Sequence, residues 1–125
     1  MKVITTNEAP AAIGPYSQAI SVSSISELVF ASGQIPVDPK TNTVGEGIEV
    51  QARQSCENVK SIMNASGLGM ENIVKTTCFL ADIADFAKFN AVYEEYFISK
   101  PARSCVAVKD LPNGVLCEIE AIGVK

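Results

Sequence analysis

The sequence contains no histidine, and this absence removes several kinds of catalytic site. A Ser–His or Cys–His nucleophile needs an imidazole as its base, so neither can exist here. The four cysteines form no Cys-x-x-Cys pair; they are Cys56, Cys78, Cys105 and Cys117. Without that spacing and without histidine, a zinc site is not expected. We therefore predict no bound metal and four free thiols, as a reducing cytoplasm maintains.

Positive charge is also scarce, with 10 Lys and Arg against 14 Asp and Glu and a net charge of -4. A nucleic-acid surface would need a basic stripe, which this composition does not favour. The first residues, MKVITTNEAP, lack the apolar region of a signal peptide. No apolar run approaches the length of a membrane span. We expect a cytoplasmic protein with no nucleic-acid partner and no membrane partner.

Apolar side chains make up 47% of the 125 residues, enough for one domain over residues 1–125 whose core needs no disulfides. Residues Val3–Thr5 suit a short edge strand. Residues 17–22 and 27–33 are rich in β-branched and apolar side chains on either side of a serine-rich segment, which predicts a hairpin. Residues 37–47 are dense in Pro, Gly, Asn and Asp, which predicts a loop.

From Ile48 to Asn64, apolar side chains recur with a helical period and polar ones fill the opposite side. The apolar positions are Ile48, Ala52, Cys56, Val59, Ile62 and Met63. Gly67 stands where a C-terminal cap belongs. The β-branched run at residues 72–80 then predicts a strand.

A second helix is predicted to begin after Asp82, which suits an N-cap, with Asp85 in the first turn. Pro101 limits how far this helix can extend. Its apolar stripe consists of Ile83, Phe86, Phe89, Tyr93 and Phe97. Strands Ala102–Val108 and Val115–Val124 follow, joined by a turn that contains Pro and Asn-Gly.

The predicted order, β-β-β-α-β-α-β-β, indicates an α+β fold: a single mixed sheet of about six strands with both helices on one face. The last strand shows what the other face carries. Cys117, Ile119 and Ala121 suit the helix-covered core, whereas Glu118 and Glu120 alternate with aliphatic side chains on the second face. Such a mixed face fits either a subunit interface that contains a polar pocket or an ordinary amphipathic face with exposed glutamates.

Arg103, at the start of a predicted strand, is the first candidate functional residue. Its guanidinium can bind a carboxylate with two hydrogen bonds and is charged at any working pH. The alternative is a salt bridge, for example with one of the glutamates. Glu118 and Glu120 can act as a general acid or base, or they are solvated strand residues. Spacing alone does not decide whether Arg103 and Glu118 share a face.

Two short motifs add weaker candidates. The GPY turn offers the phenol of Tyr16 to a site, although a tyrosine of a turn or of the core is the simpler interpretation. Ser32 and Gly33 form an SG pair, in which glycine would let a backbone N–H approach a ligand closely. The residues by themselves thus indicate a carboxylate-binding pocket with a possible glutamate base.

Six collinear segments extend over nearly the whole chain: AIGPYSQAI, ASGQIPVDP, QARQSCENVKSIM, IVKTTCFLADIADFAKFN, PARSCVAV and EIEAIGV. Together they resemble the reactive-intermediate deaminase family of the RidA/YjgF type, and the GPYSQA and PARS…EIE pieces are the most specific. The resemblance implies a chorismate-mutase-like fold and a homotrimer. In that family the sheets meet around the central axis, the helices lie outside, and ligand clefts lie between subunits.

The resemblance also implies an enzyme that hydrolyses enamines and imines such as 2-aminoacrylate to a 2-keto acid and ammonia, with no cofactor. It implies that Arg103 binds the substrate carboxylate and that Glu118, rather than Glu120, handles the water. It assigns further residues to the same pocket: Tyr16, Ser32, Gly33, Asn90 and Cys105. The segment at residues 98–100 is shorter than in some relatives, which leaves the pocket rim and the substrate size open.

Three other functions stay open at this point. A keto-acid-binding regulatory trimer would use the same Arg103 without turnover. An RNA-cleaving translation inhibitor is an activity attributed to some relatives, but the acidic composition and the missing histidine disfavour it. A mutase is suggested by analogy of fold alone.

Overall fold

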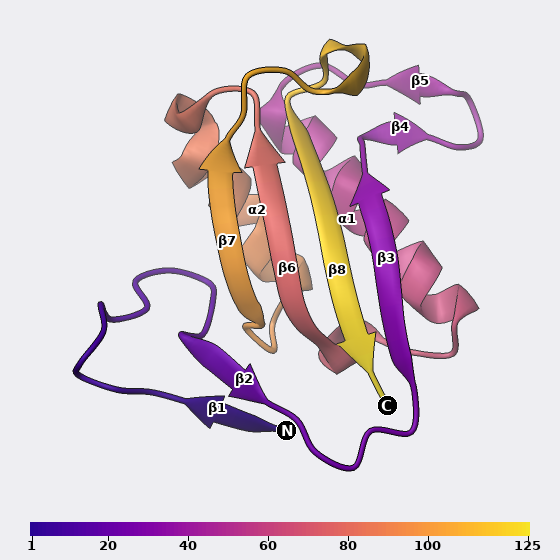
Figure 1. Cartoon of the computed structure of the whole chain (residues 1–125). Helices are drawn as coiled ribbons and strands as arrows, with labels where there is room; N and C mark the ends of the chain where they lie inside the picture. Colours follow the sequence, from indigo (N-terminus) through magenta and orange to yellow (C-terminus); the bar gives the residue numbers. More distant parts are fainter.

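A four-stranded mixed sheet organises the protein, and the computed structural model describes all 125 residues (Figure 1). The strand order is β3 (Leu28–Gln34), β8 (Cys117–Val124), β6 (Ile73–Leu80) and β7 (Ala102–Ala107). Strand β8 is antiparallel to both of its neighbours, and β6 and β7 are parallel. The edge strands are therefore β3 and β7, and β7 is the strand that carries Arg103.

Two helices cover one face of this sheet and leave the other face open (Figure 1). Helix α1 (Ile48–Ala65) precedes β6, and α2 (Phe86–Tyr96) forms the crossover that a parallel β6–β7 pair requires. The short 3₁₀ turn η2 (Ile83–Asp85) leads into α2, and the Asp82 carboxylate accepts a hydrogen bond from the N–H of Ala84 at 2.9 Å. The predicted capping role of Asp82 is thus confirmed. No helix has the length and apolar character to cross a membrane.

The core lies between the helices and the sheet and contains 17 buried residues. Alternate side chains of β8 face it, and Cys117, Ile119 and Ala121 are at most 2% exposed. Tyr93 and Phe97 of the second helix region stack on each other with ring centroids 4.1 Å apart. Burial of each large apolar side chain stabilises the fold by about 1.5–3 kcal/mol. The predicted division of β8 into two faces is therefore confirmed.

The open face carries apolar side chains that no helix covers. Phe30 is 70% exposed, Leu28 is 48% exposed and Val106 is 46% exposed. Glu118 and Glu120 project from β8 on this same face, since they alternate with the buried positions of that strand. Large exposed apolar side chains grouped on one face mark an interaction surface.

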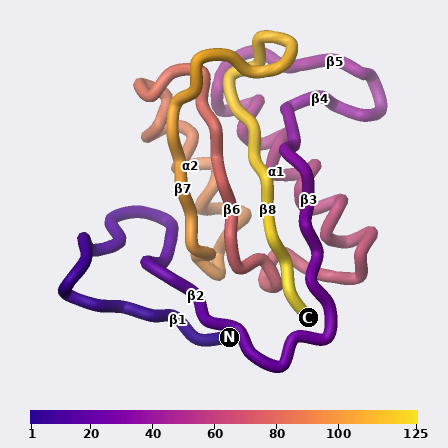
Figure 2. The backbone as a smooth tube through the Cα atoms, viewed as in Figure 1, coloured from indigo at the N-terminus to yellow at the C-terminus, as the bar shows by residue number.

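The prediction of a hairpin between residues 17–22 and 27–33 is wrong. Strand β2 (Ala19–Ser21) pairs with β1 (Lys2–Ile4), and β3 pairs with β8 from the other end of the chain. The backbone of Lys125 exchanges hydrogen bonds with Glu27 just before β3, and Figure 2 shows both chain ends at the same end of the sheet. An apolar, β-branched sequence specifies a strand but does not specify its partner.

The prediction of one sheet of about six strands is also wrong, because the strands form three sheets. Strands β1 and β2 make one pair. The loop predicted at residues 37–47 contains a second pair, β4 (Val37–Asp38) and β5 (Thr43–Val44). Two further 3₁₀ turns, η1 (Met70–Asn72) and η3 (Pro112–Gly114), join the longer elements. Only four strands belong to the main sheet.

Candidate functional site

Arg103 lies in a cluster of aromatic rings between β7 and α2. Its Nη1 donates a hydrogen bond to Oδ1 of Asn90 at 2.7 Å. The guanidinium carbon is 4.6 Å from the ring centre of Tyr93 and 5.7 Å from the ring centres of Tyr16 and Phe86. Aromatic faces attract a cation over these distances. We call these five residues the Arg103 cluster.

The N-terminal segment brings Tyr16 to this cluster. Gly14 has φ +130°, which a residue with a side chain rarely adopts, and the N–H of Tyr16 then bonds back to the Gly14 carbonyl at 2.9 Å. Ser17 pairs with Ala102 in a parallel bridge, and its Oγ donates to the carbonyl of Lys100 at 2.6 Å. The GPY turn is therefore fastened against the start of β7, directly beside Arg103.

Tyr93 forms a fixed support for the guanidinium. Its hydroxyl shares a 2.7 Å hydrogen bond with Oγ1 of Thr76, and both residues are fully buried. Burial raises the pKa of the Tyr93 phenol, so the ring is neutral at working pH. A buried, hydrogen-bonded and stacked ring has little freedom to move. The position of the Arg103 side chain therefore depends on Tyr93 and Asn90 together.

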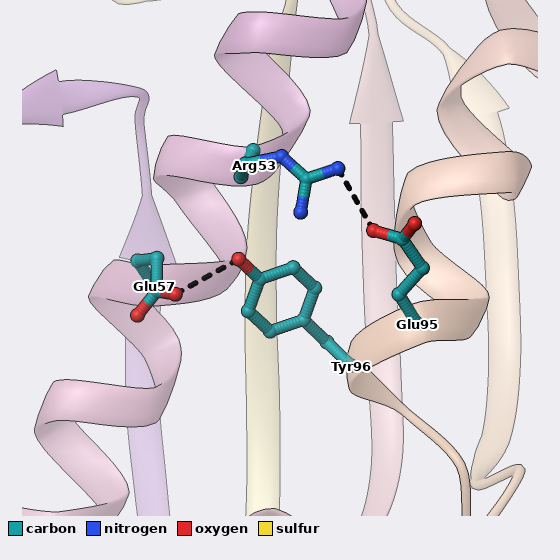
Figure 3. A network of polar contacts seen from close by, with 4 residues as sticks. All are labelled: Arg53, Glu57, Glu95 and Tyr96. Carbon is teal, nitrogen blue, oxygen red and sulfur yellow. Dashed lines mark hydrogen bonds and ion pairs between the residues drawn. The ribbon is translucent and has the colours of Figure 1, made fainter.

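The positive charge of Arg103 has no counter-ion within the chain. The protein contains one ion pair, between Nη2 of Arg53 and Oε2 of Glu95 at 2.8 Å. That pair lies on the outer side of the helices beside the Tyr96–Glu57 hydrogen bond (Figure 3). Asn90, the one polar partner of Arg103, is neutral. The structure therefore contains no salt bridge between Arg103 and a glutamate of the same chain, and that alternative is wrong.

Glu118 lies on the opposite face of the sheet. In β6, Thr76 is the partner of Arg103 and Phe79 is the partner of Glu118. Thr76 and Phe79 are three residues apart, so their side chains point to opposite faces. Strand β6 also separates β7 from β8. One chain therefore does not bring Arg103 and Glu118 together.

Glu118 lies against the backbone of Gly33 on the adjacent strand β3. Strand β3 contains one extra residue between Ala31 and Gln34 relative to β8, which is a β-bulge. A Cβ atom at Gly33 would overlap Oε1 of Glu118 and lie 2.8 Å from its Cδ. Only glycine at this position lets the Glu118 carboxylate lie across the bulge. We call Glu118 and the two bulge residues, Ser32 and Gly33, the Glu118 cluster.

Cys105 belongs with the Arg103 cluster. It is two residues beyond Arg103 on β7, so its side chain points to the same face, and it is half-buried. The neighbouring Cys78 thiol and the nearby charge of Arg103 lower the pKa of Cys105, although burial opposes this. Glu120, by contrast, is exposed and lies beside Thr77 on the open face.

Tyr93 and Phe86 belong to the apolar stripe predicted for the second helix, but their contact with Arg103 was not predicted. A signal was present, because Phe86, Asn90 and Tyr93 are spaced i, i+4, i+7 and so share one helix face. Thr76 was missed as well. Its role follows only from its burial beneath Tyr93, which a strand pattern does not reveal.

These features define a class of protein: an α+β fold with a cationic cluster at one sheet edge and a separate carboxylate cluster on the open face. No three His, Cys, Asp or Glu side chains lie together as a metal site would need. Residues 6–125 match the family described as Endoribonuclease L-PSP. The chain belongs to that family, which is the RidA/YjgF family, and the resemblance seen in the sequence is confirmed.

Relatives match over nearly the full length. The 2-iminobutanoate/2-iminopropanoate deaminase of Salmonella typhimurium is 55% identical over 128 residues, covering 99% of this chain and 98% of that protein. The crystal structure of the YjgF gene product from E. coli is 50% identical, with a TM-score of 0.76 over 100% of this chain and 99% of that one. E. coli TdcF with bound serine is 46% identical, with the same TM-score and coverage.

Proposed function

We propose that this protein hydrolyses reactive enamines and imines of the 2-aminoacrylate type to 2-keto acids and ammonia. The observation that carries the proposal is the Arg103 guanidinium, which is half-buried among aromatic rings with a neutral partner and no counter-ion. A partly buried charge without a counter-ion favours the binding of an anion. A relative named 2-iminobutanoate/2-iminopropanoate deaminase, 55% identical, supports the choice of substrate.

Arg103 binds the substrate carboxylate in this proposal. A guanidinium presents a planar fork of N–H donors that matches both oxygens of a carboxylate. Because Asn90 and Tyr93 fix the guanidinium, the bound carboxylate is fixed too, and the C=N carbon beside it is placed for attack. Tyr16 closes one side of the cluster at 5.7 Å from the guanidinium, and Cys105 adds to the lining. The structure of E. coli TdcF with bound serine, a small carboxylate, is consistent with this role.

Glu118 handles the water. A protonated imine is already electrophilic, so the reaction needs neither a metal nor an organic cofactor. Water attacks the C=N carbon and gives one proton to the Glu118 carboxylate. The carbinolamine then collapses. Glu118 returns its proton to nitrogen, the hydroxyl oxygen forms the C=O bond as the C–N bond breaks, and the C–N electrons leave with nitrogen. The hydroxyl proton passes to the departing ammonia, which leaves as ammonium, and the keto acid remains. Ser32 and the backbone N–H of Gly33 orient substrate and water in this proposal.

This mechanism requires two copies of the chain, because the Arg103 and Glu118 clusters lie on opposite faces of one sheet. We propose that the chain, acting as one domain over residues 1–125, forms a chorismate-mutase-like homotrimer. The open faces meet around the axis, where they cover Phe30, Leu28 and Val106. The edge strand β7 of one copy then lies near Glu118 of the next. A trimer with catalysis between subunits would act on imines released in the cytoplasm.

A keto-acid-binding regulatory trimer is the second candidate. The observation that favours it is the separation of the two clusters, since the Arg103 cluster can bind an anion without Glu118. RNA cleavage, which the family description mentions, has no comparable support. The net charge of -4 gives little attraction for phosphates.

An imine-hydrolysis assay tests the proposal. An amino-acid oxidase generates 2-imino acids from several amino acids, and the release of ammonia and keto acid is followed with and without the protein. We expect acceleration by the wild type and by Glu120→Gln, the matched control on the same strand face. Glu118→Gln should bind 2-ketobutyrate but lose turnover, since an amide cannot accept the proton. Binding without any acceleration by the wild type would favour the regulatory function instead.

A further inference from the structure

Two cysteines lie side by side next to Arg103. Cys78 of β6 and Cys105 of β7 are direct partners in the parallel register. Direct partners on adjacent strands point to the same face, and such strands lie about 4.8 Å apart. A disulfide requires Cα atoms about 4.4–6.8 Å apart and Cβ atoms that do not point away from each other. The backbone therefore holds these two thiols within reach of a disulfide.

The two thiols differ in access and in protonation. Cys105 is half-buried and open to a small oxidant, whereas Cys78 is 0% exposed beneath α2. The adjacent Cys78 thiol and the charge of Arg103 lower the pKa of Cys105, although burial opposes this. Burial raises the pKa of Cys78, and the contact with Cys105 raises it further, to a smaller extent. One thiol is thus an accessible nucleophile, and the other is a protonated neighbour that can resolve its oxidised form.

We propose that Cys105 and Cys78 form a reversible, peroxide-responsive dithiol–disulfide pair at the edge of the Arg103 cluster. The Cys105 thiolate attacks one oxygen of hydrogen peroxide, the O–O bond breaks, and Cys105 becomes a sulfenic acid as hydroxide leaves. The sulfur of Cys78 then attacks the sulfenyl sulfur, loses its proton, and displaces the hydroxyl group as water. The two thiols are oxidised by two electrons in total, and one peroxide is reduced to two waters. This pair does not depend on the imine hydrolysis proposed above.

The same chain contains a control pair. Cys56 of α1 and Cys117 of β8 are both 0% exposed. Burial raises the pKa of Cys56 and raises that of Cys117 to about 11. The Cys117 sulfur lies 3.7 Å from Oγ of Ser55. Neither thiol is both accessible and ionised, so this pair should stay reduced under conditions that oxidise Cys105.

Mass spectrometry after brief treatment with hydrogen peroxide tests the proposal. We expect the wild type to lose the mass of two hydrogen atoms, to regain them with dithiothreitol, and to yield a peptide cross-linked through Cys78 and Cys105. Cys78→Ala should instead trap Cys105 as a sulfenic acid, with several-fold more dimedone adduct than the wild type. Cys56→Ala, the matched core variant, should behave like the wild type.

Peptide mapping of the wild type keeps the test valid even if Cys78→Ala folds poorly. A wild type that keeps all thiols reduced while it retains its fold would overturn the proposal. So would a disulfide mapped to Cys56 and Cys117, or a dimedone signal of equal size in the wild type and in Cys78→Ala.

Discussion

Replacing Arg103 with alanine should remove most of the affinity for a 2-keto acid. A guanidinium has five N–H donors, and in the structure its one protein acceptor is Asn90. The remaining donors can bind both oxygens of a ligand carboxylate. Two charge-assisted hydrogen bonds of roughly 1.5–3 kcal/mol each correspond to a rise in Kd of about 10²–10⁴. Since Arg103 is half-buried, solvent screens part of this energy, and the lower end of the range is expected.

Calorimetric titration with 2-ketobutyrate measures this effect directly. Arg103→Lys should recover only part of the affinity, because an ammonium keeps the charge but not the planar fork. Arg53→Ala is the matched control, since it removes the exposed Arg53–Glu95 ion pair on the outer side of the helices. That variant should bind as the wild type does. If Arg103→Ala, checked for its fold by circular dichroism, kept the wild-type Kd, Arg103 would not bind the carboxylate and the mechanism would be wrong.

Three further predictions concern the same region. Asn90→Asp places a carboxylate beside Nη1 of Arg103, which neutralises the positive charge within the chain. Keto-acid binding measured by calorimetry should weaken while the melting temperature is kept. Unchanged binding would contradict the role of the free charge. Thr76→Val leaves the hydroxyl of Tyr93 buried without a partner and should lower the free energy of unfolding in urea by about 1–3 kcal/mol. The double variant Thr76→Val with Tyr93→Phe should recover most of this loss. A double variant as unstable as Thr76→Val would contradict the prediction. EDTA should leave imine hydrolysis unchanged, because no group of metal-binding side chains is present; a loss that zinc restores would show otherwise.

The helices and the faces of the last strand could be predicted from the sequence. The helix expected from Ile48 to Asn64 is observed as Ile48–Ala65, and Asp82 caps the following turn as expected. These features depend on local periodicity and on side-chain-to-backbone hydrogen bonds. The alternation in β8 was equally clear, because a single strand with one buried face fixes which residues point inward.

The pairing of strands and the separation of Arg103 from Glu118 could not be predicted. Strand β6 lies between β7 and β8, and whether Arg103 and Glu118 share a face depends on two registers that involve this third strand. Likewise, β3 pairs with β8 over a long sequence separation, which no local pattern specifies. The contact of Tyr93 with Arg103 depends on how α2 packs on the sheet edge.

The central claim is that one active site is shared between two copies of the chain. Co-expression of Arg103→Ala and Glu118→Gln chains with different tags, followed by purification through both tags, isolates mixed oligomers. In a cyclic trimer of any mixed composition, one of the three interfaces carries both intact residues, so imine hydrolysis should recover to about one third of the wild-type rate. Each variant alone should be nearly inactive. If the mixed oligomers were as inactive as the single variants, the proposal of an active site shared between two copies would be wrong.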